Sequence, residues 1–175
     1  IDGDFIENQI IFANYMLKNI NISYTEIEDF SKLSGIEKKL LREAEKVIKG
    51  SYSPYSKFKV GASVLLEGDI IVSGANQENS SYPCGICAER VAVFSASSNH
   101  PGVLIKKVAI TTKSNDFKLE FPAGPCGLCR QALLEFEEKQ KNNIEIILFN
   151  SKKIIKIAKV KDLLPFFFIE SKLKK

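Results

Sequence analysis

From residue 36 onward, the chain alternates between helical and strand-like patterns of apolar positions. Apolar side chains recur at helical spacing from Ile36 to Lys49, and Gly50 ends this run. Residues Phe58 to Leu66 then alternate as a strand does. Gly68-Asp69 marks a tight turn, and Ile70 to Ala75 follows as the returning strand. The pattern therefore predicts a helix followed by an antiparallel hairpin.

Helices and further strands alternate in the second half of the chain. Two helices are expected to begin near Cys87 and Cys126, and three strands are expected at Val103–Thr111, Ile144–Phe149 and Ile154–Val160. Strands that alternate with helices of ten or more residues are typical of a sheet covered on both faces. We therefore predict an α/β fold in which a mixed five-stranded sheet lies between two layers of helices.

The first 35 residues carry a different pattern. Apolar residues at helical spacing predict one helix, and these residues are Ile6, Ile10, Ala13, Leu17 and Ile20. Ser23 and Glu26 have the spacing of a capping box and predict a second short helix around Ile27 to Leu33, which Ser34-Gly35 would end. We therefore expect residues 1–35 to form an N-terminal helical extension and residues 36–175 to form the main domain.

The composition narrows the possible classes of protein. The chain has 175 residues, of which 45% are hydrophobic, as is ordinary for one globular domain. The net charge of +4 is modest and basic residues are not interleaved with aromatic ones, so we expect no nucleic-acid partner. No stretch reaches the roughly 20 apolar residues that span a bilayer, so we expect no membrane partner. The four cysteines do not resemble a disulfide framework, which favours a reducing, cytoplasmic location.

Three cysteines in two clusters have the spacing of a metal site. Cys126 and Cys129 are three residues apart at the expected start of one helix, where such residues share a face with Cβ atoms about 5 to 6 Å apart. Cys87 lies at the expected start of the other helix. Zinc binds thiolates at about 2.3 Å in a tetrahedron, and a catalytic site keeps three protein ligands so that the fourth position can take water. The sequence therefore predicts a catalytic Zn²⁺ site at Cys87, Cys126 and Cys129.

Glu89 and Arg90 follow the first of these cysteines. A carboxylate that stands beside zinc without binding it can carry protons as a general acid and base. Positions i and i+2 of a regular helix diverge, so Cys87 and Glu89 can face one pocket only if the helix begins at Cys87. Three thiolates overcompensate a divalent ion, and the positive ends of the two helices together with Arg90 would offset that excess.

Cys84 leaves a second interpretation open. With Cys87 it forms another C-x-x-C pair, and two such pairs resemble a four-cysteine structural zinc site. A site of that kind would be closed to water and would give no role to Glu89. The two interpretations differ in whether the thiol of Cys84 joins the other three.

The stretch from Ser53 to Phe168 resembles the small cytidine deaminases that act on free nucleosides and bind zinc through three cysteines. It covers about two thirds of the chain, in blocks that follow one another in the family's order. The blocks are Pro54-Tyr55-Ser56-Lys57-Phe58 with Val60-Gly61-Ala62, Asn76-Gln77-Glu78-Asn79, Tyr82-Pro83, Cys87-Ala88-Glu89-Arg90, Pro125-Cys126-Gly127-Leu128-Cys129-Arg130-Gln131 and Leu163-Leu164-Pro165. The resemblance implies the three-layer α-β-α sandwich of that family, with residues 36–175 as the catalytic domain.

The resemblance also implies contacts with a small nucleoside substrate. Asn76 and Glu78 match the family's pair that hydrogen-bonds the ribose hydroxyls, in particular the 3′-hydroxyl. Phe58 matches the ring that packs on the pyrimidine, and the backbone of Ala88 matches the donor to the base carbonyl. Tyr82 is placed near the sugar.

Three consecutive rings follow Pro165, and they cannot all face one core from a single element. Exposed apolar patches commonly mark an interface. In family members with this ending, a phenylalanine at the position of Phe168 reaches into a neighbour's active site. The resemblance therefore implies a homotetramer whose active sites are shared between subunits.

The implied reaction is the zinc-dependent hydrolytic deamination of cytidine and deoxycytidine, a step of pyrimidine salvage. Zinc would lower the pKa of water, Glu89 would take its proton, and hydroxide would attack C4 of the cytosine. Glu89 would then protonate N3 and the departing ammonia. Three alternatives stay open: a four-cysteine structural zinc module, a deaminase that acts on DNA or RNA, and a deaminase of a nucleoside antibiotic.

Overall fold

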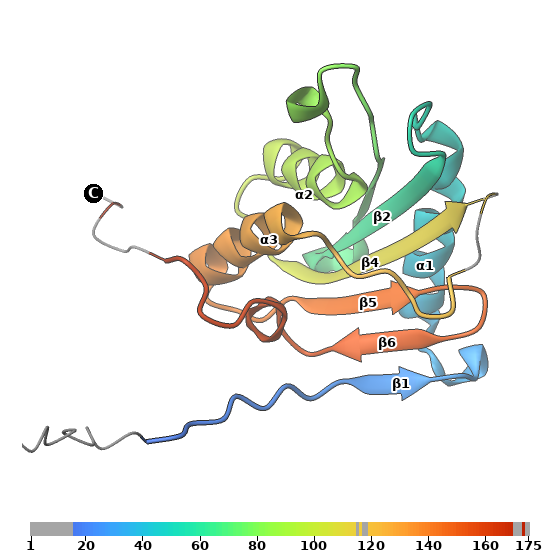
Figure 1. Cartoon of the computed structure of the whole chain (residues 1–175). Helices are drawn as coiled ribbons and strands as arrows, with labels where there is room; N and C mark the ends of the chain where they lie inside the picture. Colours follow the sequence, from blue (N-terminus) through green and yellow to red (C-terminus); the bar gives the residue numbers. More distant parts are fainter. Residues whose placement is uncertain (1–15, 115, 117–118, 170–172, 174–175) are drawn as a thin grey trace, which may run out of the picture.

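A single mixed sheet forms the centre of the molecule in a computed structural model that describes residues 16–114, 116, 119–169 and 173. Within these residues six strands pair in the order β1-β6-β5-β4-β2-β3 (Figure 1). The strands are β1 Thr25–Ile27, β2 Phe58–Leu66, β3 Ile71–Ala75, β4 Ile105–Ser114, β5 Glu145–Phe149 and β6 Ile154–Ile157. β4 and β5 are parallel and the other neighbours are antiparallel, so the predicted mixed sheet is confirmed.

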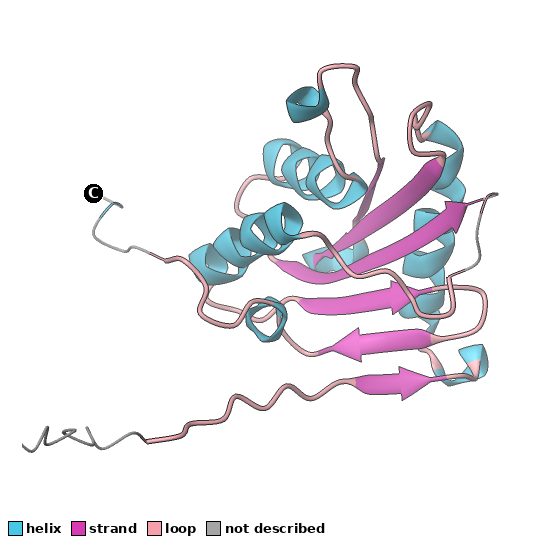
Figure 2. Ribbon diagram, in the orientation of Figure 1, coloured by secondary structure: helices cyan, strands magenta, loops and turns pink. Residues whose placement is uncertain are grey.

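Helices cover both faces of the sheet. One face is covered by α1 Gly35–Val47, and the other by α2 Ala88–Asn99 and α3 Gly127–Gln140 (Figure 2). Short 3-10 turns connect the elements, at Phe30–Lys32, Ile48–Gly50, Glu67–Asp69, Tyr82–Cys84 and Val160–Leu163. The predicted three-layer α-β-α sandwich is therefore confirmed. No helix in the described part of the chain is both long and apolar enough to cross a bilayer.

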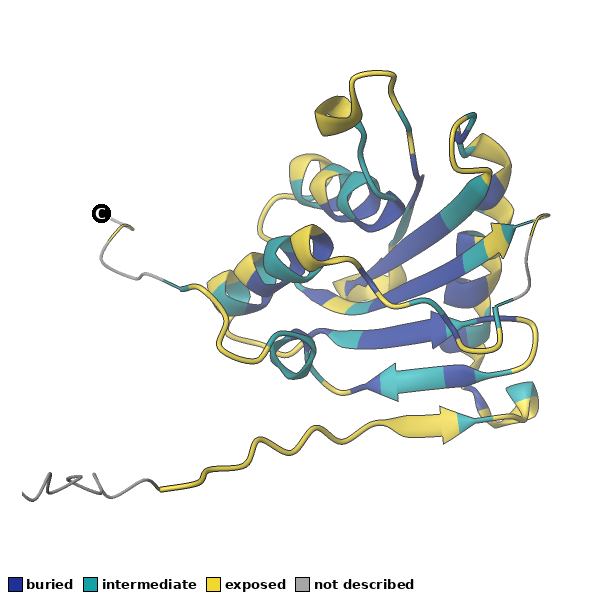
Figure 3. Ribbon diagram, in the orientation of Figure 1, coloured by how far each residue is buried: buried dark blue, intermediate teal, exposed yellow. Residues whose placement is uncertain are grey.

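The alternation of side chains along the central strands separates two hydrophobic cores. Val64 of β2 packs in the larger core, under α2 and α3, whereas its neighbour Leu65 packs in the smaller core, under α1. The same alternation holds in β4, where Val108 and Ala109 face opposite layers. Buried residues concentrate in β2, β4 and β5 (Figure 3). Successive side chains of a strand point to opposite faces of the sheet, so neighbouring apolar residues of one strand contribute to different cores.

Two glycines let the helices approach the sheet closely. A Cβ atom on Gly61 of β2 would lie 2.0 Å from the carbonyl oxygen of Ala44 in α1. A Cβ atom on Gly74 of β3 would lie 2.6 Å from the backbone nitrogen of Ala92 in α2. Both distances are far below van der Waals contact, so each helix–strand contact requires a residue without a side chain.

The sheet has one strand more than the five predicted, because residues 25–27 form β1 instead of a helix. Thr25 and Ile27 are β-branched, and β1 pairs antiparallel with the edge strand β6, whose backbone groups would otherwise lack partners. Glu26, expected in a capping box, instead forms an ion pair with Lys153 at 2.5 Å. Pairing with a distant strand thus overrides a weak local helix signal.

The predicted N-terminal helices are otherwise wrong or untested. Residues 16–24 have no regular structure, so a helix that includes Leu17 and Ile20 is wrong. Ile6, Ile10 and Ala13 lie outside the described residues. Residues 30–32 form only a 3-10 turn. The division of the chain at residue 35 stays a prediction.

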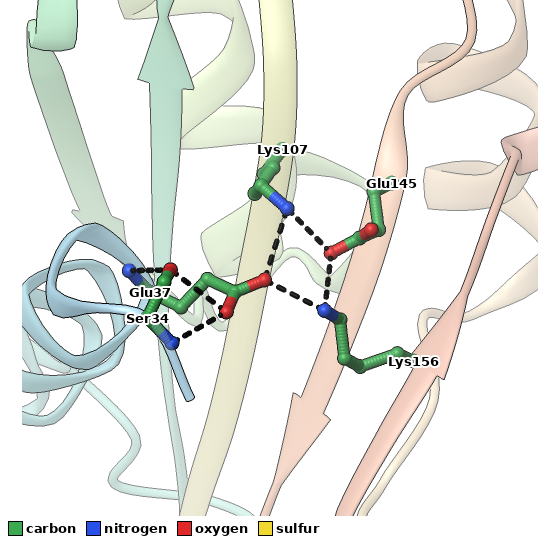
Figure 4. A network of polar contacts seen from close by, with 5 residues as sticks. All are labelled: Ser34, Glu37, Lys107, Glu145 and Lys156. Atoms are coloured by element: carbon green, nitrogen blue, oxygen red, sulfur yellow. Dashed lines mark hydrogen bonds and ion pairs between the residues drawn. The ribbon is translucent and has the colours of Figure 1, made fainter. Parts of the chain in front are cut away.

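The capping box forms eleven residues later than expected, at the start of α1. Ser34 Oγ accepts a hydrogen bond from the backbone N–H of Glu37, and the Glu37 carboxylate accepts from the Ser34 N–H at 2.9 Å. The other carboxylate oxygen binds Lys107 of β4 at 3.0 Å and Lys156 of β6 at 2.7 Å, and both lysines also pair with Glu145 of β5 (Figure 4). Ser34 therefore begins α1, instead of ending a preceding helix, and the network ties that helix to three strands.

Candidate active site

Three thiols converge where the N-terminal ends of α2 and α3 meet. Cys87 and Cys126 are the N-cap residues of the two helices, and Cys129 lies in the first turn of α3, fully buried. The sulfur atoms of Cys87 and Cys126 are 3.7 Å apart, those of Cys126 and Cys129 are 3.5 Å apart, and all three lie within 4.8 Å. Tetrahedral thiolates at about 2.3 Å from zinc stand about 3.8 Å apart. The cluster therefore fits a tetrahedral ion of that size.

Cys84 stands apart from the cluster. It is exposed in the turn Tyr82–Cys84, and the metal-binding group that the described residues offer consists of Cys87, Cys126 and Cys129. Three thiols leave one corner of a tetrahedron for water, as in catalytic zinc sites. The arrangement thus favours the catalytic interpretation over a closed four-cysteine site.

The surroundings of Cys87 favour the thiolate. Its pKa is lowered to about 5 by a hydrogen bond with Cys129 and by Arg90, whose Nη2 donates to Cys87 Sγ at 3.7 Å. The backbone groups at the start of α2 and α3 add the positive ends of two helix dipoles. Since zinc binds thiolates and not thiols, the lowered pKa of Cys87 favours this residue as a metal ligand.

Glu89 lies beside the thiols in the first turn of α2, with only 4% of its surface exposed. Burial, followed by the nearby Cys87 thiolate, raises the pKa of its carboxyl group. A carboxyl group that holds its proton more strongly than usual is suited to accept and return protons near neutral pH. The helix begins after Cys87, as predicted, which allows Cys87 and Glu89 to line the same cavity.

A cavity of about 670 Å³ opens in front of the thiols. Its size is in the range of small-molecule sites, and the predicted site residues that line it are Phe58, Asn76, Glu78, Tyr82, Cys87, Glu89, Arg90 and Cys126. Ala88 is fully buried, and its predicted contribution is a backbone N–H. Phe168 is 70% exposed and is not among the residues that line the cavity, and its predicted role in a neighbouring subunit's site stays a prediction.

Asn76 and Glu78 hold the loop and strand on which Phe58 is carried. The Asn76 side chain accepts from the Val60 N–H at 2.8 Å and donates to the Phe58 carbonyl at 2.9 Å. The Glu78 carboxylate accepts hydrogen bonds from the Tyr55 N–H at 2.9 Å and from the Ser56 N–H at 3.3 Å. The predicted contacts of both residues with a sugar stay predictions.

The structure adds residues to which the sequence assigned no role. Tyr55 packs edge-on against Tyr82 at the rim of the cavity, with ring centroids 5.9 Å apart. Ser56 also lines the cavity and hydrogen-bonds to Glu78. Both residues belong to the same sequence block as Phe58, so their position next to Phe58 in the sequence could have predicted that they lie at the site.

Arg130 and Gln131 connect the thiol cluster with the C-terminal segment. Arg130 donates to the carbonyl oxygens of Pro125 and Leu163, both at 2.8 Å. Gln131 Nε2 donates to the carbonyl oxygen of Phe168 at 3.0 Å. The helix that supplies two of the thiols therefore also holds the segment with the three rings.

Comparison with known proteins places these residues in a family. The family model of the cytidine and deoxycytidylate deaminase zinc-binding region matches residues 35–142. The chain belongs to this deaminase family. The cytidine deaminase of Sporosarcina psychrophila is 40% identical over 131 residues, which cover 74% of this chain and 89% of that protein. That of Halalkalibacterium halodurans is 37% identical over 130 residues, which cover 74% and 91%.

Solved structures of family members share the fold of this deaminase-family chain. The crystal structure of cytidine deaminase from Burkholderia pseudomallei aligns with a TM-score of 0.63 and 33% identity, and covers 74% of this chain and 97% of that one. The cytidine deaminase from Mycobacterium tuberculosis aligns with a TM-score of 0.57 and 32% identity, and covers 75% and 96%. The predicted deaminase family and fold are thus confirmed.

Proposed function

We propose that the chain catalyses the hydrolytic, zinc-dependent deamination of cytidine and deoxycytidine to uridine and deoxyuridine, as in pyrimidine salvage. The observation that carries the proposal is a buried carboxyl group, Glu89, beside three thiols that leave one tetrahedral corner free at the wall of a nucleoside-sized cavity. Membership of the deaminase family and relatives named cytidine deaminase add support.

In the proposed reaction Glu89 carries the protons. Zinc held by Cys87, Cys126 and Cys129 would supply a water molecule of lowered pKa next to the carboxylate. Glu89 takes a proton from this water and delivers it to N3 of the cytosine as oxygen attacks C4. A second proton transfer through Glu89 releases ammonia and leaves the uracil carbonyl. Burial of Glu89 keeps these transfers away from bulk water.

The substrate is held, in this proposal, along the wall of the cavity that leads away from the thiols. Phe58 packs on the pyrimidine, and the backbone N–H of Ala88 binds the base carbonyl. Asn76 and Glu78 bind the sugar hydroxyls, and Tyr82 lies next to the sugar at the rim. Polar groups placed for a sugar hydroxyl discriminate strongly against a substrate that lacks it.

Substitution of Glu89 by Gln tests the proposal. The variant should keep stoichiometric zinc, because Glu89 is not a ligand, and should lose turnover of cytidine by at least about 10³-fold. Ultraviolet absorbance measures turnover and metal analysis measures zinc. Glu45→Gln, an exposed change on α1, serves as the control and should leave both unchanged. An active Glu89→Gln enzyme would rule out the proton-transfer role.

Two additional measurements separate the alternatives. Cys84→Ser should retain zinc and activity, whereas a four-cysteine structural site requires loss of the metal and unfolding. Wild-type protein should deaminate cytidine and deoxycytidine and leave cytosine in an oligonucleotide unchanged. Turnover of the oligonucleotide alone would instead identify an enzyme that acts on nucleic acid.

We also propose that the protein is a homotetramer with shared active sites. Phe166 and Phe168 are 94% and 70% exposed. Gln131 of α3 donates a hydrogen bond to the backbone carbonyl of Phe168 and so holds this residue next to α3. Exposed rings in a fixed position are suited to a contact between subunits. The cytoplasmic location predicted from the sequence stays a prediction.

A further inference from the structure

The Glu78 carboxylate accepts three hydrogen bonds from within the chain. One carboxylate oxygen accepts hydrogen bonds from the backbone N–H groups of Tyr55 at 2.9 Å and Ser56 at 3.3 Å. The other oxygen accepts a short hydrogen bond from the Ser56 hydroxyl. These donors lie 22 and 23 residues before Glu78, so the contacts join the loop before β2 to the loop after β3.

The Ser56 hydroxyl has a second partner. While it donates to Glu78, its oxygen accepts the backbone N–H of Phe58 at 3.0 Å. One hydroxyl group therefore links the carboxylate proposed to bind the sugar with the backbone of the residue whose ring is proposed to pack on the base. Both side chains, and Ser56 itself, line the cavity.

The backbone around this link is irregular. Lys57, between Ser56 and Phe58, has a φ of 56°, in the left-handed region that side chains other than Gly disfavour. The loop Pro54–Lys57 contains no helix or strand, and its closure relies on the Lys57 N–H, which donates to the Ser53 carbonyl at 3.1 Å. The backbone N–H groups of Tyr55 and Ser56 hold one oxygen of the Glu78 carboxylate, and the Ser56 hydroxyl links the other oxygen to the backbone of Phe58.

We propose that Ser56 is a positioning residue of the nucleoside site, which orients the Glu78 carboxylate toward the sugar 3′-hydroxyl and fixes its place relative to Phe58. The inference rests on the proposed function. Each carboxylate oxygen accepts two hydrogen bonds, so the oxygen bonded to the Ser56 hydroxyl keeps one site for a sugar hydroxyl. Ser56 determines the direction in which that remaining site points.

The test compares two nucleosides that differ in one hydroxyl. In Ser56→Ala the KM for cytidine should rise about tenfold, with kcat within about twofold, because a Glu78 carboxylate that Ser56 no longer orients binds the sugar hydroxyl less tightly. The KM for 3′-deoxycytidine should change by less than about twofold, since this substrate lacks the hydroxyl that is proposed to donate a hydrogen bond to Glu78. Ser56→Thr keeps the hydroxyl and should restore the wild-type KM for cytidine.

Thermal melting and zinc content accompany these assays. Ser56 is exposed, so the Ala variant should melt within about 3 °C of wild type and keep its zinc. Equal losses on cytidine and 3′-deoxycytidine, or a fall in kcat at unchanged KM, would overturn the role of Ser56. Wild-type protein without activity on cytidine would instead overturn the proposed function, so the two failures are distinguishable.

Discussion

Arg90 links the electrostatics of the thiol cluster to the helix that begins at Cys87. Its guanidinium donates to Cys87 Sγ, and three residues on one helical turn are enough to bring the two groups together. A permanent positive charge at this place offsets part of the charge of three thiolates, which a divalent ion alone would leave in excess. The identity of residue 90 thus affects how readily protons displace a metal ion from the three thiolates.

Substitution of Arg90 by Gln should raise the pKa of Cys87 above its present value of about 5. Protons compete with the metal for the thiolate, and a thiol of higher pKa takes up a proton more readily, so the variant should release zinc at higher pH than wild type. The expected shift is about one pH unit, measured by zinc release to a colorimetric chelator. Arg42→Gln, an exposed change on α1, is the control. Identical release curves would exclude this role of Arg90.

Helix α1 is attached to the sheet by charge as well as by apolar contact. Glu37 is the third residue of the helix, yet its carboxylate reaches Lys107 and Lys156 on two strands. Burial alone would raise the pKa of Glu37, but hydrogen bonds from Lys156, the Ser34 N–H and Lys107 outweigh it and hold the pKa well below the usual 4.5. The charged form of Glu37 therefore stabilises the folded state.

Substitution of Glu37 by Gln should reduce the free energy of unfolding by about 2 kcal/mol at pH 7, because two half-buried lysines lose a shared anion. The folded pKa is depressed, so wild type loses this contribution as the pH falls below about 4.5, where the unfolded chain takes up the proton first. The difference between the proteins in urea unfolding should shrink accordingly at pH 3 to 4. Glu43→Gln, which removes an exposed ion pair, should change stability by less than about 0.5 kcal/mol. A constant difference across this pH range would contradict the assignment.

At the scale of the whole molecule, the exposed C-terminal rings predict an assembly. If the protein is the proposed homotetramer, Phe168→Ser should shift it toward smaller species and raise the KM for cytidine, since in that proposal one exposed ring serves both the contact and the neighbouring site. Light scattering after size-exclusion chromatography measures the mass. Tyr24→Ser, which changes an exposed ring at the far edge of the sheet, is the control. A tetramer that survives the loss of Phe168 would exclude this ring as an anchor.

Local patterns were sufficient to predict most of the fold and the metal cluster. Alternation predicted β2, a turn predicted β3 and apolar segments between helices predicted β4 to β6. The three-residue spacing of Cys126 and Cys129, together with Cys87 at a helix start, predicted the thiol cluster. Such signals are repeated over many residues or follow directly from helix geometry. The cluster of three thiols is therefore predictable from the sequence alone.

Contacts between distant segments could not be predicted in the same way. β1 pairs with the edge strand β6, and three residues carry too little pattern to predict this pairing. The link between Ser56 and Glu78 likewise spans 22 residues and depends on a left-handed turn at Lys57. Both features arise from the tertiary arrangement, which single-residue preferences do not encode.

The position of β1 has a practical consequence. β1 lies at the edge of the sheet opposite β3, and three strand spacings, about 14 Å, separate it from β4, which lines the substrate cavity. An exposed residue ahead of β1, such as Leu17, is therefore a suitable attachment point for a fluorophore or a surface linker. A label at that residue would modify none of the side chains that line the cavity.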